Sequence, residues 1–276
     1  MVKTIAEARA WRATTSGSVG FVPTMGALHS GHLSLVSRAR SECAHVAASV
    51  FVNPTQFGPK EDLARYPRDL PADRGLLAEA GCDVLFAPEP GEVYPAGFDT
   101  WVVPGAVGDR LEGERRPGHF RGVSTVVLKL LNVVEPARAY FGRKDAQQLA
   151  VIRRMVRDLD VPSEVVPCDT VREADGLAMS SRNAYLSPEE RAAAPVLKRA
   201  LDAARAACLA GESDAASLRD LLRGEVAREP LARLDYAAVV DPESLLEIER
   251  VEASGLALLA AFFGRTRLID NLPLRP

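Results

Sequence analysis

Continuous apolar runs alternate with segments of helical periodicity along residues 1–169. The runs predict buried strands, because a strand covered on both faces of a parallel sheet carries apolar residues at successive positions. They lie at residues 19–23, 45–52, 83–87, 139–141 and 161–167. Helices are expected at residues 4–12, from residue 32 onward, and at 73–80, 123–134 and 149–159, where apolar residues recur every three or four positions. This alternation of strand and helix predicts a parallel sheet with right-handed crossovers.

The pattern changes near residue 169, where a polar segment leads into Ser187-Pro188-Glu189-Glu190, a sequence typical of a helix N-terminus. Alanine-rich helices are expected at 189–210 and 214–228, and strands at 234–240 and 256–263, with 267–270 extending the second strand. We therefore predict an α/β domain over residues 1–169 and a smaller α+β domain over residues 170–276. Residues 88–114, rich in proline and glycine, support no prediction.

One stretch combines a strand, a glycine-containing loop and a helix start with two histidines. His29 and His32 lie three positions apart, where the loop after the first strand becomes a helix. Free N–H groups and the helix dipole make a helix N-terminus a phosphate site, and an imidazole can donate a hydrogen bond there. A loop histidine is also commonly a solvated or capping residue. The chain has 4 histidines, so two in one tetrapeptide favour the phosphate interpretation.

Further polar residues follow other predicted strands. Asn53 and Gln56 follow the second strand and Lys144 follows the fourth, at the edge where open α/β sheets bind ligands. Gln148 lies about one helical turn after Lys144 and can face the same region. Simpler interpretations exist for two positions, because Asn53 and the proline after it can form a plain turn, and Asp145 can be a helix N-cap.

Three more polar segments suit either an anion or solvent. Ser180 and Ser181 followed by Arg182 suit phosphate oxygens, since arginine donates in a forked geometry, although the triplet alone is a weak signal. The basic residues 115–122 either attract an anionic ligand or are solvated at the surface. Residues 59–68, charged and bounded by prolines, are either a mobile flap over a site or a surface turn.

Composition narrows the functional classes. The chain has 34 Lys and Arg against 37 Asp and Glu, a formal net charge of -3. It therefore lacks the overall positive charge that is typical of nucleic-acid-binding proteins. Its 4 cysteines lack metal-type spacing, and no apolar run suits a membrane span or a secretory signal, so a reducing cytoplasmic location is expected. Neither a P-loop nor a Gly-x-Gly-x-x-Gly turn is present, which argues against P-loop and dinucleotide chemistry.

A nucleotide held by His-x-Gly-His and a later serine-rich loop indicates attack at the α-phosphate. Six segments carry a wider resemblance: Pro-Thr-Met-Gly-Ala-Leu-His-Ser-Gly-His (23–32), Phe-Val-Asn-Pro-Thr-Gln-Phe (51–57), Arg-Pro-Gly-His-Phe-Arg-Gly-Val (116–123), Gly-Arg-Lys-Asp-Ala-Gln-Gln-Leu (142–149), Met-Ser-Ser-Arg-Asn (179–183) and Arg-Leu-Ile-Asp-Asn (267–271). In this order they resemble the pantoate–β-alanine ligase family, the pantothenate synthetases of the His-x-Gly-His nucleotidyltransferase superfamily. Single motifs are shared across the superfamily, whereas the set is specific.

The resemblance implies a Rossmann-like parallel-sheet domain and a smaller α+β C-terminal domain that closes over the nucleotide site. It also implies a reaction in two steps. The pantoate carboxylate attacks the ATP α-phosphorus, releasing pyrophosphate and forming pantoyl adenylate, and the β-alanine amine then yields pantothenate and AMP. Mg²⁺ is expected mainly on the ATP phosphates, with no protein metal site. The family's usual state is a homodimer, and no nucleic acid or membrane partner is implied.

The resemblance also implies roles for individual residues. His32 matches the proton donor, and His29, Lys144, Ser180, Ser181 and Arg182 match further catalytic positions. The implied ATP-binding residues are Met25, Gly26, Ala27, Leu28, His29, Ser30, Gly31, His32, Gly142, Arg143, Lys144, Asp145, Val171, Met179, Ser180, Ser181 and Arg182. Gln56 and Gln148 match the pantoate-binding glutamines, and Gln56 also lies near β-alanine. The family commonly has Glu in place of Arg143 and often Met in place of Thr55.

Three other functions fit parts of the pattern. A nucleotidyltransferase with a phosphate acceptor would need more basic acceptor residues than Gln56 and Gln148. A synthetase-like tRNA binder is disfavoured by the net charge of -3. A nucleotide-binding sensor without catalysis is disfavoured by the intact motif set, and adenylate turnover distinguishes it from a ligase.

Overall fold

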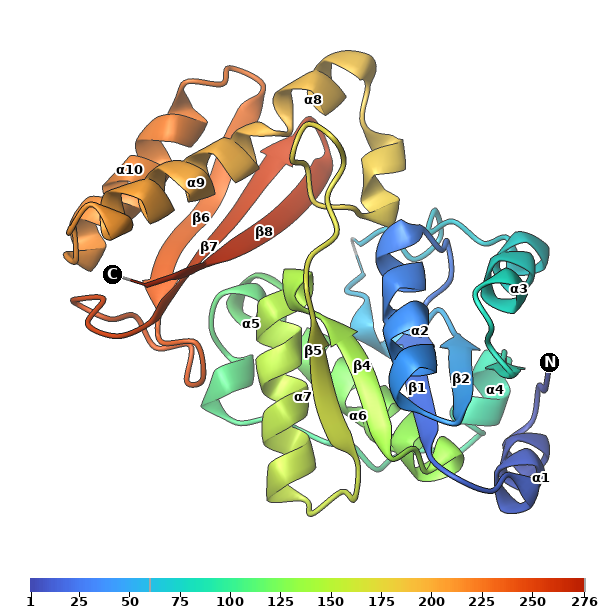
Figure 1. The fold of residues 1–276 in the computed structure, drawn as a ribbon. Coiled ribbons are helices and arrows are strands. Elements are labelled where there is room, and N and C mark those ends of the chain that lie inside the picture. Colours follow the sequence, from blue (N-terminus) through green and yellow to red (C-terminus); the bar gives the residue numbers. More distant parts are fainter. Residues whose placement is uncertain (60, 276) are drawn as a thin grey trace. The chain divides into compact units, whose positions relative to one another are not determined.

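The computed structural model describes residues 1–59 and 61–275. The chain forms two compact units (Figure 1). The first unit comprises Met1–Arg143 and Gln147–Asp169, and the second comprises Lys144–Ala146 and the chain from Thr170 onward.

A parallel sheet of five strands, within the described residues, forms the centre of the first unit. The strands are β1 (Val19–Thr24), β2 (His45–Val50), β3 (Val84–Phe86), β4 (Arg138–Gly142) and β5 (Glu164–Cys168). In the sheet the strands lie in the order β3-β2-β1-β4-β5. The side on which the chain adds its next strand therefore reverses between β1 and β4, although all five strands are parallel. The predicted Rossmann-like sheet is thus confirmed, and such a reversal is where doubly wound sheets bind ligands.

Helices cover both faces of this sheet. They are α1 (Ile5–Thr14), α2 (Ser30–Glu42), α3 (Leu70–Glu79), α6 (His119–Val134) and α7 (Ala146–Asp158), with the short α4 (Pro90–Val93) and α5 (Glu112–Arg115). One apolar cluster joins α1, α6 and α7 to the sheet, and another joins α2 and α3 to it. Adjacent residues of β1 divide between them, because Phe21 belongs to the first cluster and Val22 to the second.

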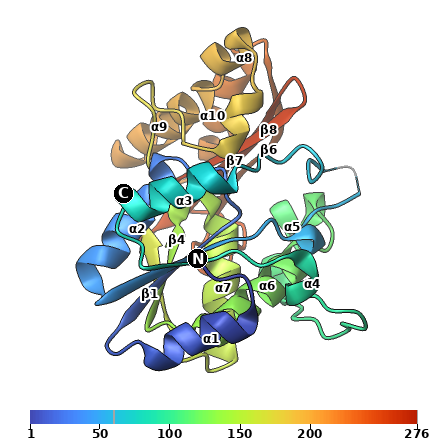
Figure 2. The same cartoon turned by 90° about the vertical axis from the view of Figure 1, so that its right-hand side faces the viewer.

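The second unit contains an antiparallel sheet with strand order β6-β7-β8 (Figure 1, Figure 2). Its elements are α8 (Pro188–Ala193), α9 (Val196–Leu209), α10 (Ala215–Ala227), β6 (Ala232–Val240), β7 (Gly255–Phe263) and β8 (Thr266–Leu274). Leucine, valine and alanine side chains of α9 and α10 share an apolar core with the strands. This is the α+β unit expected from the alanine-rich helices and the strand patterns after them.

Two predicted elements of the second unit are wrong in extent. The helix expected at 189–210 is divided, because Pro195 has no N–H to donate and its ring clashes with a preceding carbonyl. Residues 267–270 do not extend the second strand but belong to β8, which pairs back onto β7. The reversal is a tight turn, in which Phe263 faces Thr266 and Gly264 has φ +56°.

Helix starts in the first unit are earlier than predicted, because local groups cap them. The α2 helix begins at Ser30, since the His29 side chain accepts a hydrogen bond from the Gly31 N–H. The α3 helix begins at Leu70, since Asp69 accepts from the Ala72 N–H. Arg143–Asp145 forms a 3₁₀ turn that leads directly into α7, and the N-cap role of Asp145 stays a prediction.

Candidate active site

The loop after β1 is shaped by a buried carboxylate. Gly26 and Ala27 have φ of 83° and 52°, a left-handed conformation that disfavours a side chain. Asp73, on α3 and 3% exposed, accepts hydrogen bonds from the Ala27 N–H at 3.0 Å and the Leu28 N–H at 2.8 Å. The loop from Met25 to Leu28 is therefore held from outside its own sequence. Sequence reasoning missed Asp73, because an acidic residue in the first turn of a helix is ordinary dipole compensation.

The two motif histidines meet at the start of α2. Their ring centroids are 4.1 Å apart. His29 Nδ1 accepts from the Gly31 N–H at 3.1 Å, so Nδ1 carries no proton in this arrangement. His32 lies in the first helical turn, after Ser30 and Gly31. The capping role considered for a loop histidine is thus confirmed for His29.

Gln56 is buried beyond the end of β2, in the 3₁₀ turn Pro54–Gln56. Asn53 Nδ2 donates to Gln56 Oε1 at 3.0 Å and to the Gly122 carbonyl at 3.1 Å. Gln56 Nε2 donates to Met25 Sδ at 3.1 Å. The Asn-Pro sequence does make a turn, and its side chains also connect this loop to the loop after β1.

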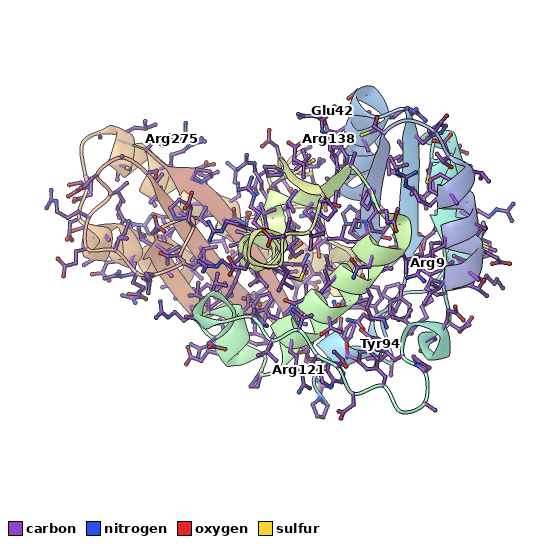
Figure 3. The ribbon with its side chains drawn as sticks, turned by 90° about the horizontal axis from the view of Figure 1, so that it is seen from below. Arg9, Glu42, Tyr94, Arg121, Arg138 and Arg275 are labelled. Atoms are coloured by element: carbon purple, nitrogen blue, oxygen red, sulfur yellow. The ribbon has the colours of Figure 1, made fainter. Side chains whose placement is uncertain are left out.

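An aromatic cluster supports the same loop from the part of the chain that the sequence left unassigned. Tyr94 donates its hydroxyl to Asn53 Oδ1 at 2.9 Å and lies 3.1 Å from Thr55 Oγ1. Its ring stacks on Trp101, and the Arg121 guanidinium lies over the Trp101 ring at 4.6 Å from its centroid. Figure 3 labels Tyr94 and Arg121 within the first unit. A methionine in place of Thr55 would not make the hydroxyl contact.

A series of hydrogen bonds links the Glu61 carboxylate to the backbone of Gln56. Arg116 donates to both carboxylate oxygens of Glu61, at 3.0 and 2.6 Å. Its Nη1 lies 3.0 Å from His119 Nε2, and His119 Nδ1 lies 2.9 Å from the Gln56 carbonyl oxygen. Because arginine only donates, His119 accepts at Nε2 and donates from Nδ1.

These contacts bear on two predicted surface segments. The basic segment 115–122 has its Arg116 paired with Glu61, within the protein. In the segment 59–68, Tyr66 is buried and packs edge-on against Phe57. Lys60 lies outside the described residues. The proposed mobility of 59–68 as a flap stays a prediction.

The titration of His119 makes this series of hydrogen bonds depend on pH. Burial, together with the charge of Arg116, lowers the pKa of His119 to about 4, from an ordinary value of 6.5. Because the pKa of His119 is lower in the folded than in the unfolded protein, its contribution to the free energy of unfolding is fully present above pH 6.5. This contribution is lost as the pH falls towards 4, because unfolding then takes up a proton.

We expect His119→Asn to remove this dependence, since asparagine keeps a donor and does not titrate. Between about pH 7 and pH 4 the wild type should lose roughly 3 kcal/mol of unfolding free energy relative to the variant. Urea unfolding of both proteins at successive pH values measures this. A constant difference across the range would show that His119 is not buried in its neutral form.

The end of β4 carries the next predicted residues. Gly142 closes the strand, and Arg143 is exposed, with its Nε 3.2 Å from Asp169. Of the two glutamines on α7, Gln147 is buried and structural, because it accepts from the Glu112 N–H and donates to two carbonyls of the preceding loop. Gln148 is half-buried, which suits the ligand role expected of it.

The remaining predicted residues belong to the second unit and cluster in one loop. The Met179 N–H donates to the Val171 carbonyl at 3.0 Å, so these two positions face each other across a narrow hairpin. Ser180 caps a 3₁₀ helix, Ser181–Tyr185, by accepting from the Arg182 N–H at 3.3 Å. Residues 179–182 are thereby held beside Val171.

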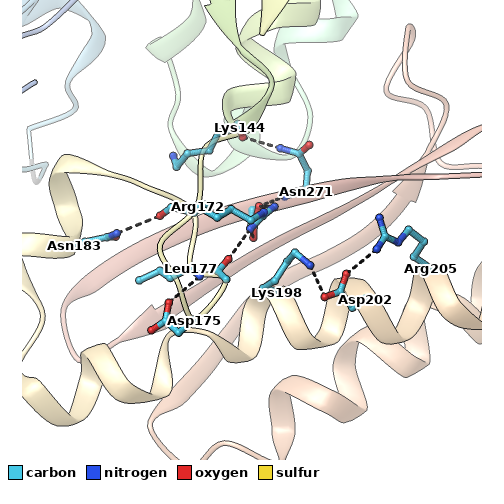
Figure 4. A network of polar contacts seen from close by, with 12 residues as sticks. Lys144, Arg172, Asp175, Leu177, Asn183, Lys198, Asp202, Arg205 and Asn271 are labelled. Carbon is cyan, nitrogen blue, oxygen red and sulfur yellow. Dashed lines mark hydrogen bonds and ion pairs between the residues drawn. The ribbon is translucent and has the colours of Figure 1, made fainter. Parts of the chain in front are cut away.

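Lys144 and Asp145 also belong to the second unit. The Lys144 ammonium lies 3.4 Å from Asp145 Oδ1, with a side chain that is 19% exposed. Figure 4 shows Lys144 with the polar residues around it.

Two further features are absent from residues 1–59 and 61–275. No group of three histidine, cysteine or acidic side chains there is arranged to hold a metal ion. No helix in these ranges is long and apolar enough to cross a membrane.

The sheet order and the His-x-Gly-His segment after its central strand define an α/β nucleotide-binding fold. The family model described as pantoate-beta-alanine ligase matches residues 1–273, and the chain belongs to this family. A pantothenate synthetase of Herpetosiphon aurantiacus is 58% identical over 273 residues, which cover 99% of each chain.

Solved structures agree with this membership. The pantothenate synthetase of Thermus thermophilus has a TM-score of 0.96 and 56% identity, covering 100% of this chain and 99% of that one. The pantoate-beta-alanine ligase of Francisella tularensis, complexed with beta-gamma ATP and beta-alanine, has a TM-score of 0.80 and 34% identity, covering 98% of this chain and 96% of that one. The chain is therefore an enzyme, a pantoate–β-alanine ligase that uses ATP as a substrate.

Proposed function

We propose that this ligase joins pantoate to β-alanine through a pantoyl-adenylate intermediate. A pantoate carboxylate oxygen bonds to the ATP α-phosphorus while the bond to pyrophosphate breaks. The β-alanine amine then bonds to the acyl carbon while AMP leaves, and the amine loses a proton. The observation that carries this proposal is the pair His29 and His32 at the start of α2, next to the reversal point of a parallel sheet.

The geometry at α2 supports transfer at phosphorus. The positive end of the α2 dipole favours a phosphate group, His29 occupies the N-cap position there, and His32 is proposed as the proton donor. Pantoate is already ionised at neutral pH, so the first step needs alignment and charge stabilisation rather than a general base. Donors held in place before the reaction stabilise charge as it develops.

Pantoate is proposed to bind Gln56 and Gln148, and β-alanine to bind near Gln56. Neutral amides can orient a hydroxyl and a carboxylate without reducing the nucleophilicity of that carboxylate. Gln56 suits this role because Asn53 and Met25 fix its side chain before any substrate binds. The hydrogen bond from His119 to its carbonyl fixes the backbone as well.

ATP is proposed to bind Met25 to His32, Gly142 to Asp145, Val171 and Met179 to Arg182. Within these ranges, Lys144 contacts phosphate and Asp145 contacts ribose, while Ser180, Ser181 and Arg182 contact phosphate oxygens. The forked guanidinium of Arg182 suits two oxygens at once. Mg²⁺ is proposed to be held mainly by the polyphosphate and water, the ligands that this ion prefers.

The proposal is tested by following AMP release from ATP and Mg²⁺ with D-pantoate, with and without β-alanine. We expect multiple turnovers of AMP only when both substrates are present, and pyrophosphate release with pantoate alone. ATP binding without any pantoate-dependent release would instead support a sensor or a different transferase.

Two further properties belong to this proposal. We propose a homodimer, which light scattering of the purified protein would test against a monomer. We also propose a cytoplasmic location, in keeping with Cys43, Cys82, Cys168 and Cys208, all of which are free thiols.

A further inference from the structure

Two adjacent polar residues of β8 are buried in the second unit. Asp270 is 3% exposed and Asn271 is 5% exposed. They end the segment Arg-Leu-Ile-Asp-Asn, which carries part of the family resemblance but has no role in the reaction proposed above. Each of the two bonds to a different segment that contains proposed ATP-binding residues (Figure 4).

Asn271 holds the backbone of Lys144. Its side-chain Nδ2 donates to the Lys144 carbonyl oxygen at 2.7 Å. The Asn271 N–H in turn donates to Asp270 Oδ1 at 2.8 Å, so the carboxylate also orients the asparagine. The bond to Lys144 restricts the point from which the lysine side chain extends.

Asp270 holds the hairpin that leads to the serine loop. It accepts from both terminal nitrogens of Arg172, at 2.6 and 2.9 Å, in a pair whose side chains are 2% and 17% exposed. Arg172 also donates to the Gly176 carbonyl and forms a β-bridge with Ala178. The positions on either side of this bridge are the proposed ATP-binding residues Val171 and Met179.

We propose that Asp270 and Asn271 form a positioning dyad that aligns Lys144 and the loop at residues 179–182 for ATP. Replacing a buried ion pair by apolar residues is often neutral or stabilising, so stability alone does not account for such a pair. The geometry of the ion pair explains its presence, because the Asp270 carboxylate bonds to Arg172 in the hairpin and also orients Asn271, which holds Lys144. The dyad rests on the proposed ATP-binding roles and touches the ATP-binding segments rather than the reacting atoms.

The first test is a double-mutant cycle on ATP affinity, measured by calorimetry without turnover. Asn271→Ala should weaken ATP binding about tenfold, since it removes the donor that holds the Lys144 backbone. In a Lys144→Ala background the same change should have less than about a twofold effect, because the side chain that it positions is gone. Equal effects in both backgrounds would overturn the link between Asn271 and Lys144.

The second test compares two ion pairs of the same sheet. Arg267 donates to Asp235 from Nε at 3.0 Å and from Nη2 at 2.7 Å, and the Asp235 side chain is 16% exposed. Asp270→Asn should weaken ATP binding at least about tenfold more than Asp235→Asn, with the KM for β-alanine unchanged. Equal losses in the two variants would mean that Asp270 only stabilises the fold.

If Asp270→Asn does not fold, Arg172→Lys replaces it, because lysine keeps the charge and loses the two-bond geometry. The tests also distinguish a failure of the dyad proposal from a failure of the proposed function. Wild type that binds ATP but forms no AMP with pantoate and β-alanine would reject the proposed function, and the affinity cycle would still decide the dyad. Wild type that does not bind ATP would reject both.

Discussion

Replacing His32 by alanine is expected to slow pyrophosphate release from ATP and pantoate by about 10²–10³-fold, the usual cost of losing one preorganised donor at a developing charge. His32 lies in the first turn of α2, with its ring 4.1 Å from that of His29. The loss should fall on the rate of the first step, since the proposed pantoate-binding residues are Gln56 and Gln148. Rapid-quench measurement of a single turnover, with pantoate affinity measured separately, tests this.

His45→Ala is the matched control for that experiment. His45 begins β2, and its Nδ1 lies 3.9 Å from Asp83, away from any proposed substrate contact. We expect its first-step rate to remain within about twofold of the wild type, as is usual for a surface substitution. An unchanged rate in His32→Ala, or an equal loss in His45→Ala, would remove the proton-donor role from His32.

Gly122→Ala is expected to disturb the loop at residues 53–57, which carries Gln56, a proposed pantoate-binding residue. A Cβ atom at this position of α6 would lie 2.4 Å from the Thr55 carbonyl oxygen and 2.7 Å from the Gln56 nitrogen. Both are backbone atoms, so the loop must move. We expect a loss of about 1–3 kcal/mol in unfolding free energy, typical of overpacking, and a rise of at least about tenfold in the KM for pantoate.

Gly75→Ala provides the control, because Gly75 is also helical and a Cβ there meets nothing within 4 Å. Alanine should be neutral or up to about 1 kcal/mol more stable at that position, through its higher helix propensity. Urea unfolding and pantoate-dependent kinetics of both variants make the comparison. A normal pantoate KM in Gly122→Ala would show that Gln56 does not depend on this close approach.

Most strands of the first unit could be predicted from sequence because they are buried on both faces. Such burial produces an unbroken apolar run, and β1, β2 and β4 lie where these runs are. The apolar stripe predicted for α6 could be read equally well, since the residues spaced every three or four positions along it are all buried, namely Val123, Val126, Val127, Leu130, Leu131 and Val134. The sheet class followed from the alternation of the elements.

The boundaries of helices and strands were harder to predict, because they depend on a single side chain or a single turn. The start of α2 depends on a histidine in a capping role usually filled by serine, threonine or aspartate. The separate strand β8 depends on a tight turn at Gly264, and the polar residues at 264–267 do not by themselves show that the chain reverses there. The segment 88–114 had no periodicity, and Gln147 holds part of it by side-chain bonds from a distant helix.

The motif residues and their order can be read from the chain alone, and they identify the family. Those residues are local, since His29 and His32 share one turn, and Ser180, Ser181 and Arg182 are consecutive. The groups that hold them in place are visible only in the folded protein. Asp73 under the loop after β1, His119 behind Gln56, and the dyad of Asp270 and Asn271 act across long chain separations. Their hydrogen bonds leave no periodic trace in the chain, because a contact between distant residues constrains geometry rather than local composition.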